Sequence, residues 1–199
     1  HSEKVFIMKR LLLILILTLS FQSLTKADDI TDFEIEGMSI GDSLLDFFNE
    51  SDIKNKKKLH YPSSKKYYLI SFSNMSFFEN YKYVQLILLT NDNKYIIHSV
   101  AGKILYDNEF DKCNNKKRLI TKDILKVLNI EPQINDGDIL RGDKSGNSIS
   151  NSVSFFFDND DQVIIDCSDW SNEVTYNDNL KISLLPNYLN RWILDEAFK

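Results

Sequence analysis

The chain has 199 residues, 43% of them hydrophobic and 27% charged, and its 24 basic and 29 acidic residues give a formal net charge of -5. This length suits one domain of ordinary size, and the composition is typical of a globular protein with a real core. Disorder and a protein with several membrane spans are thereby excluded, and the acidic balance without a long basic stripe disfavours nucleic-acid binding.

The N-terminal residues have the pattern of a secretory signal peptide. Residues 1–7 precede the first methionine and are interpreted as an upstream extension. Lys9 and Arg10 supply positive charge, residues 11–19 form an apolar run, and Ala27 ends a small-residue cleavage site. We therefore expect residues 1–27 to be an upstream extension plus a signal peptide and residues 28–199 to form a single domain.

Export has consequences for location and charge. The apolar run is much shorter than the roughly 20 residues that span a bilayer, so the sequence predicts no transmembrane anchor after cleavage. No cysteine lies near the junction to carry a lipid, and we expect a periplasmic or secreted product. Cleavage would leave 28 acidic and 20 basic residues, a net charge of about -8.

The chain has two cysteines, Cys113 and Cys167. An even pair in an exported chain predicts a disulfide, although two buried free thiols are the alternative. Closing a loop of about 54 residues would stabilise the fold by roughly 4 kcal/mol on the chain-entropy model. The wide spacing, with no histidine near either cysteine, predicts no metal site.

The first element predicted after the signal peptide is a helix that begins near residue 39. Ser39 is a favourable N-cap, and Asp42 places a carboxylate in the first turn, where it interacts well with the helix dipole. Ile40 and Leu44 then fall on one face. The polar run at residues 49–58 ends the helix.

Three strands are predicted next, at residues 67–72, 83–90 and 95–101. Aromatic and β-branched residues are frequent in these stretches, as is typical of strands. Residues 91–93 read Asn-Asp-Asn, which is a hairpin signal. These segments predict an antiparallel meander.

A longer helix is predicted over residues 109–129. Cys113, Ile120 and Ile124 recur at helical spacing, and Lys117 lies at the edge of the same face, where its aliphatic stem is tolerated. Pro132 follows the helix and prevents its continuation.

The last part of the chain is predicted to be mostly β. Residues 133–151 are polar and rich in glycine and are expected to form a long surface loop. A hairpin at residues 153–157 and 163–167 and a short strand at 181–184 follow, and Pro186 begins a C-terminal helix. We therefore predict an α+β domain in which an antiparallel sheet packs against a long helix, with N- and C-terminal helices.

One motif resembles a catalytic signature. Gly41-Asp42-Ser43-Leu44 is similar to the motif of the GDSL (SGNH) hydrolases, in which the serine is the nucleophile. That family also needs an Asp-x-x-His pair near the C-terminus, which this chain lacks.

The histidines offer little more. After residue 27 the histidines are His60 and His98, and either could act as a general base or be purely structural. We assign no catalytic residue, no metal ligand and no cofactor from the sequence.

Larger stretches of the chain carry a second resemblance. Residues 27–30 and 36–46, the helix around Cys113 and residues 167–170 resemble an uncharacterised family of small exported proteins of Pelagibacter-like marine alphaproteobacteria. Glu36-Gly37-Met38-Ser39, opening a helix before antiparallel strands, is similar to the BamE/SmpA-type envelope modules. These resemblances imply a Gram-negative envelope setting and a binding role, without an assigned activity.

The sequence therefore favours an exported, non-catalytic binding or accessory module. Its expected partner is an envelope protein or a small ligand, and its oligomeric state stays open. One alternative is an envelope serine hydrolase that uses Ser43. The other is a carrier of a small apolar ligand, with a pocket beneath the aromatic strands.

Overall fold

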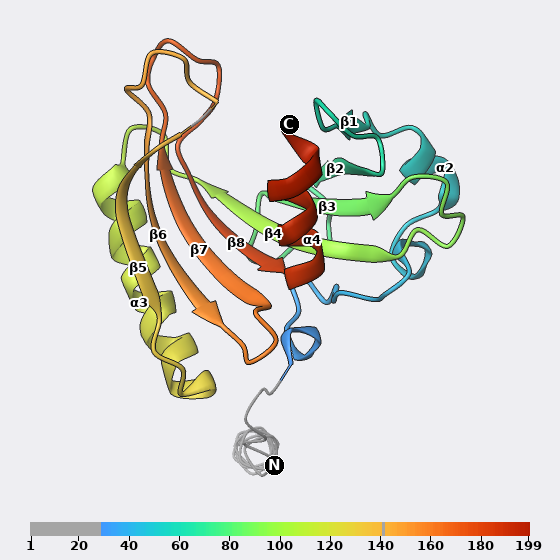
Figure 1. The fold of residues 1–199 in the computed structure, drawn as a ribbon, viewed down its shortest axis with the longest axis horizontal. Coiled ribbons are helices and arrows are strands. Elements are labelled where there is room, and N and C mark those ends of the chain that lie inside the picture. Colours follow the sequence, from blue (N-terminus) through green and yellow to red (C-terminus); the bar gives the residue numbers. More distant parts are fainter. Residues whose placement is uncertain (1–28, 141) are drawn as a thin grey trace, which may run out of the picture.

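The computed structural model describes residues 29–140 and 142–199; the predicted extension and signal peptide lie outside this range. Its main feature is one eight-stranded sheet in the order β1-β2-β3-β4-β8-β7-β6-β5, antiparallel throughout (Figure 1). The strands are β1 (Leu59–His60), β2 (Tyr67–Ser73), β3 (Tyr83–Leu89), β4 (Ile97–Leu105), β5 (Gln133–Ile139), β6 (Ile149–Phe156), β7 (Gln162–Asp169) and β8 (Asn179–Leu185).

The described helices are few. Apart from α3 (Phe110–Leu128), which lies against β7 and β8, each has at most six residues. They are the 3-10 turns η1 (Ile30–Asp32) and η2 (Leu44–Asp46), the helices α2 (Glu50–Lys54) and α4 (Asn187–Trp192), and the π-helical turn η3 (Ile193–Ala197). In the part of the chain that the structure describes, no helix has the length and apolar character needed to cross a membrane.

The predicted α+β fold class is wrong, because the domain is organised by the sheet rather than by helices. Two segments account for the difference. The predicted N-terminal helix is replaced by turns, and the predicted loop at residues 133–151 contains β5 and the beginning of β6. The structure is therefore mostly antiparallel β.

Tertiary pairing explains why residues 39–48 do not form a helix. The backbone N–H of Gly41 donates to Ile97 O, that of Ile97 to Asp42 O, and that of Leu44 to Tyr95 O. Gly41 has φ +96°, a conformation outside the helical region that glycine adopts readily. Pairing with the start of β4 thus outweighs the local preference for a helix.

The two faces of the sheet have different coverings. One face is apolar along a row of paired residues that crosses six strands and is buried beneath α3 and residues 30–55. The row consists of Ile70, Leu86, Val100, Leu184, Val163 and Phe155. On the opposite face α4 covers one region, where Leu189 and Trp192 pack on Tyr67 and Ile87. Much of the rest of that face carries polar side chains, among them Ser150, Asp166 and Lys181.

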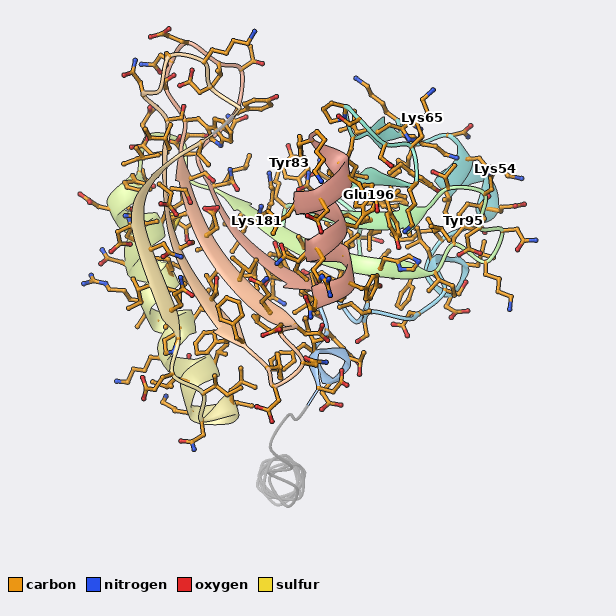
Figure 2. The ribbon with its side chains drawn as sticks, viewed as in Figure 1. Lys54, Lys65, Tyr83, Tyr95, Lys181 and Glu196 are labelled. Carbon is orange, nitrogen blue, oxygen red and sulfur yellow. A yellow bond between two sulfur atoms is a disulfide. The ribbon has the colours of Figure 1, made fainter. Side chains whose placement is uncertain are left out.

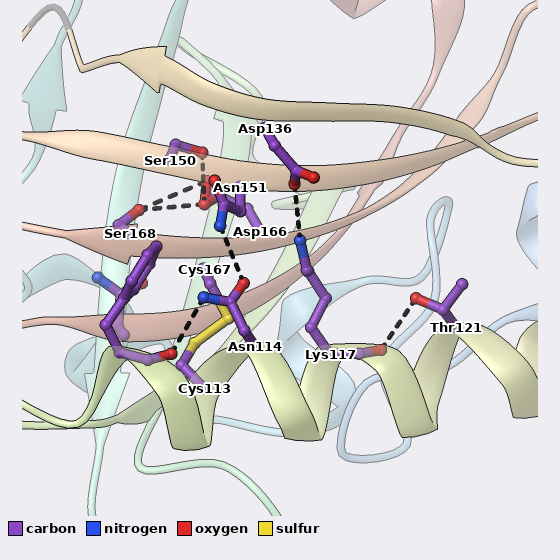
Figure 3. Close-up of a disulfide and its surroundings, with 12 residues drawn as sticks. Cys113, Asn114, Lys117, Thr121, Asp136, Ser150, Asn151, Asp166, Cys167 and Ser168 are labelled. Carbon is purple, nitrogen blue, oxygen red and sulfur yellow. Dashed lines mark hydrogen bonds and ion pairs between the residues drawn. A yellow bond between two sulfur atoms is a disulfide. The ribbon is translucent and has the colours of Figure 1, made fainter.

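The predicted disulfide between Cys113 and Cys167 is present, with a Cα–Cα distance of 5.9 Å. Both cysteines are buried in the core. The bond ties the first turn of α3 to β7 and so holds the helix in place on the sheet (Figure 3).

Candidate functional site

A cavity of about 730 Å³ lies between α3 and two neighbouring strands at one edge of the sheet, the edge strand β5 and its partner β6. Its volume falls within the range of about 300–1,000 Å³ that is typical of small-molecule sites. We call it the α3 groove and define it by its lining residues on three elements. They are Asp111, Asn114, Asn115, Lys117, Arg118, Thr121, Lys122 and Leu125 on α3, Ile134 and Asp136 on β5, and Asn151 and Val153 on β6.

Helical spacing and the disulfide together position this wall of α3. Asn114, Lys117, Thr121 and Leu125 follow one another at intervals of three or four residues and therefore share one face of the helix. The neighbouring Cys113 anchors the helix to β7. Because β6 and β5 come after β7 in the sheet order, this helix face lies alongside them and completes the groove.

Lys117 is the central polar residue of the groove. Only 6% of its side chain is exposed, and its Nζ lies 3.4 Å from Oδ1 of Asp136, whose side chain is 64% exposed. Figure 3 shows the lysine reaching from α3 towards β5. An ammonium group carries three N–H donors, and this long contact is the hydrogen bond that the described residues provide for them. An ammonium group with unused N–H donors at the wall of a cavity is suited to receive an anion.

The amides beside Lys117 are held in a fixed arrangement. Asn114 donates to Phe110 O at 3.1 Å, and Asn151 donates to Oδ1 of Asn114 at 3.2 Å. Oδ1 of Asn151 in turn accepts a hydrogen bond from Gly137 N at 2.8 Å. This network joins α3, β5 and β6, so the polar end of the groove is preorganised.

The other end of the groove is apolar. Leu125, Ile134 and Val153 line it, and Ile134 is 62% exposed. The groove therefore presents a buried ammonium group next to an apolar surface. This combination suits an amphiphilic anion, whose charged group binds the lysine while its hydrocarbon portion covers the aliphatic side chains.

Charge in the groove reinforces this preference. Lys117, Arg118 and Lys122 supply three positive charges, against two from Asp111 and Asp136. The groove is thus locally positive on a chain whose formal net charge is -5. Among the described residues no group of three or more His, Cys, Asp or Glu side chains is placed to hold a metal ion.

Ser43 lies outside the groove and serves the backbone. Its hydroxyl donates to Lys94 O at 2.7 Å and accepts from Leu45 N as the N-cap of η2. Neither partner is a general base.

The two histidines contact residues other than Ser43. Nδ1 of His98 lies 2.8 Å from the hydroxyl of Tyr188, and burial lowers the pKa of His98. His60 is exposed on β1, with its ring 5.9 Å from that of Tyr68. The structure therefore does not join these histidines to Ser43 by hydrogen bonds.

The sequence alone predicts Lys117 only as a tolerated residue at the edge of a helix face. A lysine among buried positions was the available signal, since buried lysines are rare unless they are paired. The β5 wall gives no such signal, because the polar, glycine-containing sequence of residues 133–151 predicts a loop.

Comparison with known proteins gives no further guide to the site. No protein-family model matches the chain, and searches of curated proteins and of solved structures found no significant match.

Proposed function

We propose that the protein is an exported, non-catalytic binding module that holds a small amphiphilic anion in the α3 groove. The observation that carries this proposal is the largely buried Lys117 side chain, which lines a cavity with an apolar end. A periplasmic location agrees with the predicted signal peptide and with the Cys113–Cys167 disulfide, because such bonds form in oxidising compartments.

A linear carboxylate with a medium-length hydrocarbon chain has the required chemistry. Its carboxylate can accept charge-assisted hydrogen bonds from Lys117. Its chain can cover Leu125, Ile134 and Val153, which contributes about 0.8 kcal/mol for each methylene removed from water. The exposed Asp136 can turn towards solvent when the ligand carboxylate replaces it beside Lys117.

Calorimetric titration with decanoate tests this proposal. Decanol, which has the same chain without the charge, is the matched ligand control. Replacing Lys117 with methionine keeps the packing of the stem and removes the charge. Because a hydrogen bond to a charged group contributes about 1.5–3 kcal/mol, Lys117→Met should weaken decanoate binding by about 10- to 100-fold.

Lys116→Met is the matched protein control, since Lys116 is an exposed lysine on the same helix. It should leave the affinity for decanoate unchanged. Absence of decanoate binding, or equal binding by wild type and Lys117→Met, would contradict the proposal. Equal binding of decanol and decanoate would instead support the apolar-ligand carrier.

The serine hydrolase alternative predicts ester hydrolysis that is lost in a folded Ser43→Ala variant. The hydroxyl of Ser43 donates to Lys94 O, and among the described residues no hydrogen bond joins it to His60 or His98. The contacts of Ser43 therefore give this alternative no support. We expect no difference between wild type and Ser43→Ala in hydrolysis of short-chain nitrophenyl esters.

A further inference from the structure

A second cavity, of about 380 Å³, lies on the sheet face opposite to α3. Its floor on the sheet combines the polar side chains of Ser71 on β2, Gln85 on β3, Lys103 on β4 and Asn179 on β8 with those of Tyr83 and Leu105. We call it the lysine cavity. It shares no lining residue with the α3 groove.

Two lysines lie side by side on this face of the sheet, and one of them, Lys103, lines the cavity. Lys103 on β4 and Lys181 on β8 are direct partners in the antiparallel register, so they project from the same face of the sheet. Figure 2 labels Lys181 and also Tyr83, the partner of Lys103 on β3, on the face that carries α4. Like charges directly opposite each other destabilise a sheet. The pair therefore does not serve the stability of the fold.

One carboxylate, that of Asp166, lies beside this pair and offsets one of its two positive charges. Asp166 on β7 is the register partner of Lys181, but its Oδ1 accepts hydrogen bonds from Ser150 at 2.9 Å and from Ser168 at 3.2 Å. Neither lysine forms a salt bridge with any residue that the structure describes. Burial and the neighbouring Lys181 lower the pKa of Lys103 to about 8.

Aromatic side chains cover the cavity. Trp170 and Tyr176, from the segment between β7 and β8, line it with their ring centroids 4.7 Å apart. The backbone N–H of Trp170 donates to Asp178 at 2.7 Å. Gly142 also lies against the indole, where an added Cβ would be 3.2 Å from the ring. The indole is therefore held in place above the floor.

We infer that the lysine cavity binds a small hydroxylated carboxylate with the chemistry of a hexuronic acid. The carboxylate would bind the Lys103 ammonium group, and the neighbouring Lys181 adds positive charge beside it. The ligand's hydroxyl groups match the Ser71 hydroxyl and the Gln85 amide, while the Trp170 ring offers a flat surface to a sugar ring. A cavity near the lower end of the small-molecule range suits a single sugar unit.

Calorimetric titration of the full chain with glucuronate at pH 7 tests this inference. Glucose is the neutral control, and inorganic phosphate is the control for an anion without a sugar ring. Glucuronate should bind, and Lys103→Met should weaken it at least tenfold. Lys181→Met should also weaken it, whereas Lys65→Met, which changes an exposed lysine before β2, should not.

The pH dependence adds a second readout. The titratable groups that face Lys103 are Tyr83 on β3, Lys181 on β8, Asp166 on β7 and Tyr176 above the cavity. With a pKa of about 8, Lys103 is mostly charged at pH 7 and mostly neutral at pH 9.5. The affinity of the wild-type protein for glucuronate should fall about 30-fold between these pH values, and the affinity of Lys103→Met should change much less.

Three results would overturn the inference. They are no binding of glucuronate at millimolar concentration, equal binding of glucose, and a response to phosphate without one to glucuronate. The inference stands apart from the proposed function, because Lys117→Met should leave glucuronate binding intact and Lys103→Met should leave decanoate binding intact.

Discussion

Replacing Lys103 with methionine should stabilise the protein at neutral pH. The folded state lowers the pKa of this lysine from 10.5 to about 8, so the protein folds against the preference of the ammonium group for water. Each pKa unit corresponds to about 1.36 kcal/mol, and the full difference therefore costs at most about 3 kcal/mol at pH 7. Methionine retains most of the buried aliphatic stem, so we expect a gain of about 1–3 kcal/mol.

The sign of the pH dependence identifies the cause. Between pH 8 and 10.5 the unfolded chain binds more protons at Lys103 than the folded protein does, so this lysine becomes less destabilising as the pH rises. The stability difference between Lys103→Met and wild type should accordingly shrink by about 2 kcal/mol from pH 7 to pH 9.5. Tyrosines whose pKa is raised by burial, such as Tyr188 at about 12, are common to both proteins and cancel in the difference.

Urea unfolding at the two pH values, followed by tryptophan fluorescence and far-UV circular dichroism, measures this difference. Lys65→Met controls for the loss of one exposed positive charge and should give a small difference that does not change with pH. A Lys103→Met variant that is destabilised at both pH values would refute the reasoning. A stability gain that stays constant with pH would refute it equally, because desolvation of an ammonium group must disappear when the group is neutral.

Two further predictions concern stability. Replacing Cys113 and Cys167 with serine should lower the free energy of unfolding by roughly 4 kcal/mol in urea unfolding, since the bond closes a loop of 54 residues. The presence of the bond would be contradicted if intact mass showed both thiols of the wild-type protein alkylated under non-reducing conditions. Asp143 accepts hydrogen bonds from Ser145, Ser148 and Ser171, and these lower its pKa, so it stabilises the fold above pH 4 and this contribution is lost as the pH falls. Asp143→Asn should therefore melt below wild type at pH 7, with a gap that narrows in acid, and a gap that widens in acid would count against this account.

Short-range patterns predicted the central strands well. The predicted strands at residues 67–72 and 83–90 agree with β2 (Tyr67–Ser73) and β3 (Tyr83–Leu89). Alternation of buried and exposed side chains is a property of the strand itself and is therefore visible in a single sequence. The disulfide was predictable for a similar reason, because the sequence contains one possible pair.

Local patterns failed where a long-range partner decides the conformation. Residues 41–44 carry helix signals, yet they pair with the start of β4, which lies more than 50 residues later. β5 is polar, largely exposed and shifted in register between Asn135 and Asp138, so it has no strand pattern of its own and is a strand because β6 pairs with it. These two errors led to the incorrect fold class.

The pairing of Cys113 with Cys167 and the positions of the central strands are predictable from the sequence, because the chain has two cysteines and because strand alternation is a pattern among near neighbours. The two cavities, in contrast, arise from the pairing of strands that are far apart in the sequence. Pairing of β4 with β8 places Lys103 beside Lys181, 78 positions away in the sequence, and pairing of β5 with β6 places Asp136 opposite Lys117. Both placements depend on which strands become neighbours, and that choice is made by burial of the whole sheet rather than by any one segment.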